Sequence, residues 1–225
     1  MKFTDAHIHV QGIGNSDAEL MFCNVSRPSE WNVLEELIRK NSKIIPFFGT
    51  HPWYSDEYDG SENLYKILEK YPSANVGEIG LDKIRSGNNS EKIFTEQLDI
   101  AERMNRIVCI HNVRSADRIL SELKKRDVRS ILHSYDGSAD MAPAFVKCNC
   151  YFSVSPRLFK KPENKVSDIL HSIPKDRLLT ESDSSGEVTV KMQELLTKIS
   201  DVLSVDVNEL SEITGQNARE LLRSK

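Results

Sequence analysis

The feature that most constrains the fold is an alternation, along the whole chain, of short strand-like runs with longer helix-like segments. Segment 89–105 is the clearest helix, because Phe94, Leu98, Ala101 and Met104 recur at a spacing that puts apolar side chains on one helical face. Strands that alternate with helices favour parallel pairing through βαβ units. The expected strands span residues 2–9, 19–25, 43–49, 74–78, 106–111, 130–133, 149–155 and 177–181, and the other expected helices span residues 31–40, 64–70, 116–125, 139–147 and 206–222.

Eight such strands fit a single domain over residues 1–225, and we expect an α/β fold, a TIM-type (β/α)8 barrel. No linker, charge block or internal repeat divides the chain. The connection at residues 10–18 is too short and glycine-rich for a helix, so the barrel is expected to have an abbreviated first crossover.

Two local features refine this expectation. Pro46 falls inside the third strand, where it would remove a ladder donor, so we expect it to mark the start of that strand, with only Phe47 and Phe48 fully paired. Asp206 is placed to cap the last helix, with Glu209 three residues later as in a capping box.

Composition limits the partners and the compartment. The net charge of −4 gives no global basic field that would draw the chain to nucleic acid or to a membrane, so a DNA substrate would have to be met by local cations. No stretch approaches the length of a membrane-spanning helix, and the first twenty residues lack the apolar core of a signal peptide. The four cysteines show no paired spacing, which favours reduced thiols and a cytoplasmic protein.

Residues able to bind a metal recur where the expected strands end. Asp5, His7 and His9 alternate along the first strand, so all three are expected on its interior face. Barrel enzymes place their chemistry at the carboxyl ends of the strands, and two imidazoles aimed at one point suit Zn²⁺, Mn²⁺ or a related ion. Among the histidines only His171 lies elsewhere, and we assign it no role. The residues at the ends of later strands are His51, Glu78, His111, His133 and Asp183.

Two acids carry much of this interpretation. Glu78 stands between glycines at the end of an apolar strand, where an unpaired carboxylate would be costly to bury. A pair of cations bridged by the carboxylate would offset that cost, and a salt bridge to Lys83 or Arg85 is the alternative. Asp183 follows an apolar strand in the same way, whereas Glu181 lies deeper and is expected to be an outer partner of a ligand.

These segments resemble the TatD family of metal-dependent deoxyribonucleases, within the amidohydrolase-like TIM barrels. The resemblance runs from residue 2 to about residue 222. Its motifs are Asp5-Ala6-His7-Ile8-His9, Gly49-Thr50-His51-Pro52, Gly77-Glu78-Ile79-Gly80-Leu81-Asp82, Ile110-His111, Leu132-His133-Ser134-Tyr135-Asp136-Gly137-Ser138 and Glu181-Ser182-Asp183.

The resemblance implies a cofactor of two divalent metal ions, Mg²⁺, Mn²⁺ or Zn²⁺. It also implies that Glu78 and Asp183 are catalytic, with Asp183 orienting or deprotonating the attacking water. The implied metal ligands are His7, His9 and Asp183 for one ion, His111 and His133 for the other, and Glu78 as the bridge.

The chain departs from the family where substrate would be gripped. The run His111-Asn112-Val113-Arg114 moves an arginine one residue along from its usual place, and residues 184–187 lack the usual proline and aromatic residue. Arg114 is expected to contact a phosphate through two hydrogen bonds. Arg85 is a second expected substrate contact, and His51 is expected to face substrate or to support the rim.

Three functions are open at this point. The favoured one is hydrolysis of DNA phosphodiester bonds, and the runner-up is an amidohydrolase-like esterase, lactonase or deacylase acting on a small molecule. A scaffold that merely retains its ligands is the third, and it gains little support because no ligand position is lost. The expected partner is DNA or a small phosphodiester or ester, with no membrane, and the oligomeric state stays open.

Overall fold

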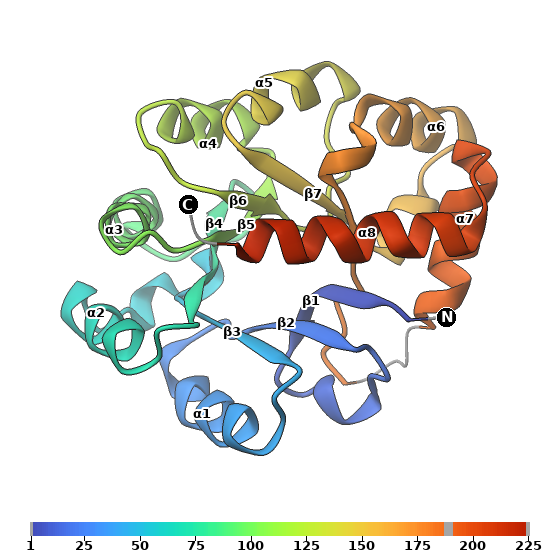
Figure 1. The fold of residues 1–225 in the computed structure, drawn as a ribbon. Helices are drawn as coiled ribbons and strands as arrows, with labels where there is room; N and C mark the ends of the chain where they lie inside the picture. The colour runs from blue at the N-terminus through green and yellow to red at the C-terminus, as the bar shows by residue number, and fades with distance from the viewer. Residues whose placement is uncertain (1, 187–190, 224–225) are drawn as a thin grey trace.

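Eight parallel strands, hydrogen-bonded in sequence order, form the centre of the fold (Figure 1), in a computed structural model that describes residues 2–186 and 191–223. The sheet closes on itself because the segment after β8 joins β1, with the backbone N–H of His9 donating to the Ser184 carbonyl at 3.0 Å. The prediction of a TIM-type barrel is therefore confirmed. The strands are β1 (Thr4–His9), β2 (Leu20–Asn24), β3 (Ile44–Phe48), β4 (Asn75–Asp82), β5 (Val108–Val113), β6 (Ser130–Leu132), β7 (Cys150–Val154) and β8 (Leu178–Thr180).

Helices surround the strands and include two that the sequence did not indicate, α6 (Glu163–Ser172) and α7 (Met192–Leu203). The first crossover holds only a single 3₁₀ turn, η1 (Ile13–Asn15), so the abbreviated connection is confirmed. Among the described residues, no helix has both the length and the apolar character to cross a lipid bilayer. The helices are α1 (Trp31–Lys40), α2 (Ser61–Lys70), α3 (Ser90–Arg103), α4 (Ala116–Leu123), α5 (Ala142–Val146), α6 (Glu163–Ser172), α7 (Met192–Leu203) and α8 (Val207–Leu222).

The last helix closes the amino end of the barrel. Asp206 caps α8 as expected, because its Oδ1 accepts hydrogen bonds from the backbone N–H groups of Asn208 and Glu209. The helix then runs across the barrel (Figure 1), where Asn217 donates to the Leu178 carbonyl at the start of β8. Side chains of α8 join the apolar cluster inside the barrel, which leaves the carboxyl ends of the strands as the open mouth. That inner cluster comprises Ala6, Phe22, Phe47, Ile107, Cys109, Ile131, Tyr151, Leu179, Ala218 and Leu221.

The expectation for Pro46 is wrong, because β3 begins two residues earlier, at Ile44. The carbonyls of Lys43 and Phe47 accept hydrogen bonds from β2, so the odd-numbered residues of this stretch bond that neighbour. The nitrogen of Pro46 therefore faces β4, whose pairing with β3 begins only at Phe47. The proline sits inside the strand without removing a ladder donor.

Candidate metal centre

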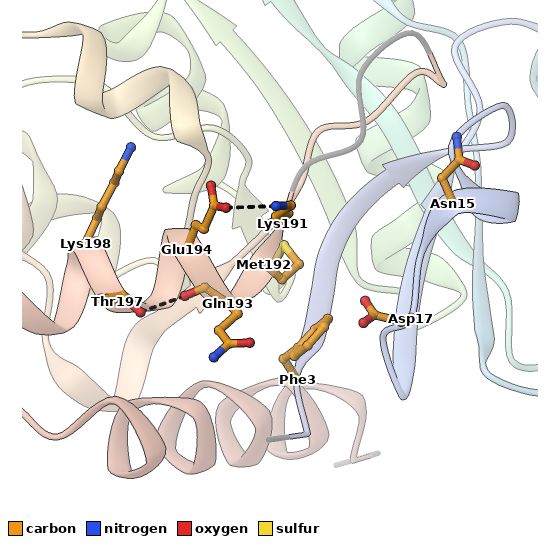
Figure 2. A pocket seen from close by; sticks show the side chains of 9 residues that line it. All are labelled: Phe3, Asn15, Asp17, Lys191, Met192, Gln193, Glu194, Thr197 and Lys198. Carbon is orange, nitrogen blue, oxygen red and sulfur yellow. Dashed lines mark hydrogen bonds and ion pairs between the residues drawn. The ribbon is translucent and has the colours of Figure 1, made fainter.

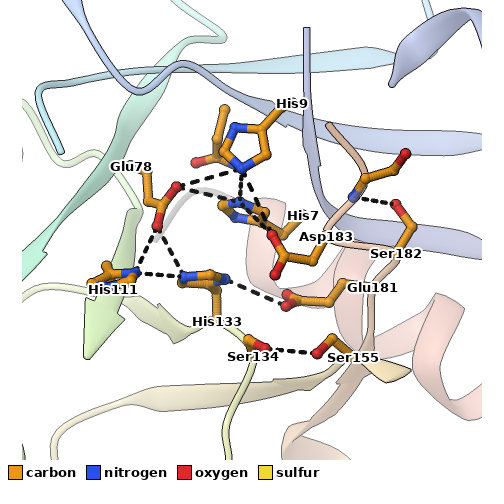
Figure 3. Close-up of polar contacts among 12 residues, drawn as sticks. His7, His9, Glu78, His111, His133, Ser134, Ser155, Glu181, Ser182 and Asp183 are labelled. Carbon is orange, nitrogen blue, oxygen red and sulfur yellow. Dashed lines mark hydrogen bonds and ion pairs between the residues drawn. The ribbon is translucent and has the colours of Figure 1, made fainter. Parts of the chain in front are cut away.

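Four histidines and two acids from five strand ends meet at the barrel mouth (Figure 3). The Nε2 atoms of His7 and His9 lie 3.4 Å apart, and both lie 3.7 Å from Asp183 Oδ1. On the other side, Glu78 Oε1 lies 3.1 Å from His111 Nδ1 and 2.9 Å from His133 Nε2. Glu78 Oε2 reaches back toward His7 at 3.5 Å, so this carboxylate stands between the two groups of imidazoles. The structure thus brings together all six residues that the sequence placed in the metal site.

Two β-bulges direct His7 and Glu78 into the barrel. In β1, Ala6 and His7 together stand opposite Phe22 of β2, and in β4, Gly77 and Glu78 together stand opposite Cys109 of β5. In each case a small residue enters the inner apolar cluster or the space beside it, and the residue that follows it turns toward the mouth. Simple alternation along a strand would have put one member of each pair outside.

The bulge in β1 overturns one expectation. Asp5 pairs in register with Met21, which packs in the outer core, so Asp5 does not share the inward face of His7 and His9. It is fully buried, and its Oδ1 accepts a hydrogen bond from the backbone N–H of Ser182 at 2.8 Å. Burial raises the pKa of Asp5 to about 7, against the hydrogen bonds from Ser182. Asp5 therefore ties β1 to the segment after β8 and stands outside the metal site.

Glycines next to Glu78 allow the neighbouring groups to approach. A Cβ on Gly77 would lie 2.6 Å from Asn24 Oδ1 and 2.8 Å from the Cβ of Cys109. A Cβ on Gly80 would lie 2.0 Å from the carbonyl oxygen of His111, and Gly80 has a φ of 149°, which side chains rarely allow. The glycines on both sides of Glu78 thus let β5 pass close enough to place His111 beside it.

Three histidines have a polar group behind the outer ring nitrogen, which is a carboxylate for His111 and His133 and a thiol for His7. His7 Nδ1 lies 3.2 Å from Cys109 Sγ, His111 Nε2 lies 3.3 Å from Asp82 Oδ2, and His133 Nδ1 lies 3.4 Å from Glu181 Oε1. A proton held on the outer nitrogen leaves a lone pair on the nitrogen that faces the cluster, as a metal ligand requires. Glu181 is itself held by the hydroxyl of Ser153, as expected for an outer partner.

His51 is different, because a donor lies behind it. The backbone N–H of Trp53 donates to His51 Nδ1 at 3.1 Å, so the proton of the neutral ring lies on Nε2. That Nε2 is 3.2 Å from Glu78 Oε1 and can donate to it, but it has no lone pair for an ion. Burial lowers the pKa of His51 despite the nearby Glu78 charge, in keeping with a neutral ring.

Charges within the cluster stabilise one another. Burial opposes ionisation of Glu78, but attraction to the surrounding imidazoles outweighs burial and holds the pKa of Glu78 well below its ordinary value. Burial likewise opposes the charge of His133, but the nearby Glu78 raises the pKa of His133 well above its ordinary value. Burial also opposes the charge of Asp183, and a hydrogen bond from His9 lowers the pKa of Asp183 to about 2. Both acids are therefore carboxylates at neutral pH, which gives the centre two anionic ligands.

This donor set fits divalent ions. Ligand atoms lie within 4.8 Å of one another in the sets His7–His9–Glu78 and His7–His133–Asp183, and imidazole with carboxylate is a ligand combination that Zn²⁺ and Mn²⁺ accept. A third set, His51–Glu78–His111, meets the distance criterion but includes the ring whose lone pair is already used. Asp183 is the most accessible acid of the centre, with 30% of its side chain exposed, and it has a left-handed backbone (φ 52°).

The expected substrate contacts lie around the mouth. Arg114 is exposed directly after β5 and has a left-handed backbone (φ 52°). Arg85 is exposed after β4, with its guanidinium carbon 4.1 Å from the centroid of the Trp53 ring. His51 is buried and contacts Glu78, beneath the rim on which the sequence placed it. Of the segment 184–187, Glu187 lies outside the described residues.

Asp82 and Cys109, the residues behind His111 and His7, were not predicted to have a role in the site. A signal existed for Asp82, which lies four residues after Glu78 in the same strand and just before the chain leaves it. No feature of the sequence indicated Cys109, because a cysteine in an apolar strand is typical of a buried core position.

A pocket of about 880 Å³ lies away from this centre, between the start of β1 and the first turns of α7 (Figure 2). Its lining has no histidine and no residue of the cluster, so it adds nothing to the metal centre. The lining residues are Phe3, Asn15, Asp17, Lys191, Met192, Gln193, Glu194, Thr197 and Lys198.

The chain is similar to several known proteins. The chain is similar to the metal-dependent hydrolase YabD of Bacillus subtilis (strain 168), which is described as uncharacterized, with 26% identity over 84% of this chain and 81% of that protein. It is 25% identical to human deoxyribonuclease TATDN3 over 81% of this chain and 76% of that protein. The solved structure of YjjV, a TatD homologue from Escherichia coli, superposes with a TM-score of 0.85 at 20% identity, covering 97% of both chains. The family described as TatD related DNase matches residues 4–223, and the chain belongs to this family.

Proposed function

We propose that this metal-dependent hydrolase of the TatD family cleaves phosphodiester bonds of DNA at the barrel mouth. The observation that carries the proposal is the convergence of His7, His9, His111 and His133 on the Glu78 and Asp183 carboxylates. Support also comes from relatives named as deoxyribonucleases, among them human TATDN3. When bound, divalent ions would acidify a water molecule and neutralise charge on the phosphate.

Each residue has a proposed part in holding two ions. His7, His9 and Asp183 form one ligand group, and His111 with His133 forms the other. Glu78 is the proposed bridge, because its two oxygens face the two groups separately. His51 donates its Nε2 proton to Glu78 and so fixes the direction of that carboxylate.

Asp183 is the proposed proton acceptor. It is ionised at neutral pH, it is the acid of the centre most open to solvent, and it lies across from Glu78 beside His7 and His9. A carboxylate in this position can orient a water molecule and accept its proton. Arg114 on the rim can hold a phosphate oxygen through its guanidinium.

The direct test is hydrolysis of single-stranded DNA with Mg²⁺, Mn²⁺ or Zn²⁺, beside a small ester and a small phosphodiester. Asp183→Asn is expected to lose at least about 100-fold in turnover, because the proton acceptor becomes a neutral amide. Asp201→Asn, the same change on an exposed residue of α7, is the matched control and should retain activity. DNA left intact under every metal would overturn the proposal.

A small-molecule esterase, lactonase or deacylase is the second candidate. It is favoured by the net charge of −4 and by the small residues Ser184, Ser185 and Gly186 that follow Asp183, where the family usually has proline and an aromatic residue. In the assay above, cleavage of the ester alone would select this second function.

We also propose that the protein is cytoplasmic. All four cysteines are free thiols, as expected for a protein kept under reducing conditions.

A further inference from the structure

An exposed tryptophan stands at the mouth of the barrel. Trp53 lies in η3 (Pro52–Glu57), directly after β3, and is 39% exposed. Among the described residues, four large apolar or aromatic side chains are exposed: Val33 and Tyr65 lie on the outer helices α1 and α2, whereas Trp53 and Ile84 follow strands at the catalytic end. Exposed apolar surface beside a reactive centre points to contact with a ligand.

Asp82 fixes the orientation of this indole. Trp53 Nε1 donates to Asp82 Oδ2 at 2.7 Å, and the same oxygen lies 3.3 Å from Nε2 of His111. The other oxygen of Asp82 accepts from the backbone N–H groups of Ile84 and Arg85 at 2.7 and 2.9 Å. One buried carboxylate therefore holds both a proposed metal ligand and the exposed ring, so the ring is already ordered before a ligand arrives.

Arg85 stacks on the Trp53 ring and adds a positive charge beside it. Its guanidinium carbon lies 4.1 Å from the centroid of the Trp53 ring, and the side chain is exposed. The rings of His51 and Trp53 are nearly perpendicular, with centroids 4.9 Å apart, so the stack begins beside the metal centre. A flat aromatic surface with a planar cation suits a nucleobase with its phosphate, because bases stack both on indole rings and on arginine planes.

We propose that Trp53 and Arg85 form a stacking platform for the nucleobase next to the phosphodiester at the metal centre. The inference rests on the proposed nuclease function and adds to it a site for an unpaired base, because a base within a duplex is already stacked on its neighbours. Base stacking at Trp53 gives the net acidic chain an affinity for DNA that does not depend on a basic surface.

The first test measures binding rather than turnover. The Mn²⁺-loaded protein is titrated with fluorescently labelled decathymidylate carrying phosphorothioate linkages, which resist hydrolysis, and with an abasic oligomer of the same length. We expect the thymidylate oligomer to bind about 5- to 150-fold more tightly, and Trp53→Leu to abolish this difference. Tyr65→Leu, which removes an exposed aromatic ring on α2, is the matched control and should retain the difference. Equal binding of the two oligomers by the unmodified protein would overturn the platform.

A second variant distinguishes base stacking on Trp53 from the hydrogen bond that Trp53 donates to Asp82. Trp53→Phe keeps a ring but loses the Nε1 hydrogen bond to Asp82, so it should retain most of the preference for bases that Trp53→Leu loses. If Trp53 only positions Asp82, the leucine and phenylalanine variants will lose the same turnover on base-bearing and abasic substrates, and the platform is refuted. A protein that prefers thymidylate through Trp53 but cleaves no DNA would support the platform and refute the proposed nuclease function.

Discussion

Two buried glutamates in this chain, Glu78 and Glu122, both lie among nitrogen-containing side chains, but different groups neutralise their carboxylates. Glu78 lies in the barrel mouth among imidazoles, whereas Glu122 lies on α4 among the permanent cations Arg118, Lys125 and Arg126. Lys125 Nζ is 2.8 Å and Arg126 Nη1 is 2.7 Å from the oxygens of Glu122. The charge of Glu122 is thus fully compensated by the fold itself.

The negative charge of Glu78 has no permanent cation beside it among the residues of its cluster. Its neighbours are histidines, whose charge changes with pH, and a carboxylate behind each of His111 and His133 can hold a proton on the outer ring nitrogen. A group of lone pairs and carboxylates without a permanent cation favours an incoming metal ion. The cations around Glu122 are permanent, whereas the compensation of Glu78 depends on the protonation of histidines or on a bound metal ion.

The largest effect that this comparison predicts concerns Glu78→Gln. The amide cannot bridge two ions, so turnover should fall by at least about two to three powers of ten. In metal-free protein at pH 7, the unfolding temperature should fall, because the amide loses the attraction between the carboxylate and the surrounding imidazoles that holds the pKa of Glu78 below its ordinary value. Kinetic assays and thermal unfolding check the two halves. Activity within tenfold of the unmodified protein would place the chemistry elsewhere.

Metal ions should stabilise the fold only by binding at the barrel mouth. Ions that bind only the folded chain add about 2.7 kcal/mol when present at about 100 times their Kd. For a chain of 225 residues this corresponds to a rise in Tm of roughly 5 to 10 °C. Thermal scans with Mn²⁺ and with a chelator measure the rise. It should vanish in Glu78→Gln and persist in Glu122→Gln, and a rise in both would mean that the ions bind outside the mouth.

Asp82→Asn should weaken metal binding at the centre without removing a ligand. The carboxylate behind His111 holds its Nε2 proton, and loss of such outer partners typically lowers metal affinity about 10- to 100-fold. Calorimetric titration with Zn²⁺ measures the affinity, with Asp201→Asn as the control. Unchanged affinity would show that the backbone alone orients His111.

The convergence of the metal centre was predictable, but its detailed construction was not. A closed parallel barrel brings its strand ends together, so histidines far apart in the chain, such as His7 and His133, could be placed at one mouth from their positions alone. The bulges at Ala6–His7 and Gly77–Glu78 could not be foreseen, because strict alternation was assumed and it placed Asp5 on the wrong face. Cys109 was missed because its contact with His7 joins residues 102 positions apart.

The smallest predicted effect concerns pH and Glu122. Partial burial opposes its charge, but hydrogen bonds from Lys125 and Arg126 and the charge of Arg118 lower the pKa of Glu122 to about 2, from an ordinary value of 4.5. Because the folded pKa is the lower one, the stabilisation is complete above pH 4.5 and is lost as the pH falls from 4.5 toward 2. Relative to Glu122→Gln, the unmodified protein should be more stable by about 1 to 2 kcal/mol at pH 7, less than the full shift would give because Arg118 and Lys125 are partly exposed. Urea unfolding of both proteins between pH 7 and pH 3 measures the difference. A difference that stays constant down to pH 3 would mean that Glu122 acts through packing rather than through its charge, and the contrast with Glu78 would then lose its electrostatic basis.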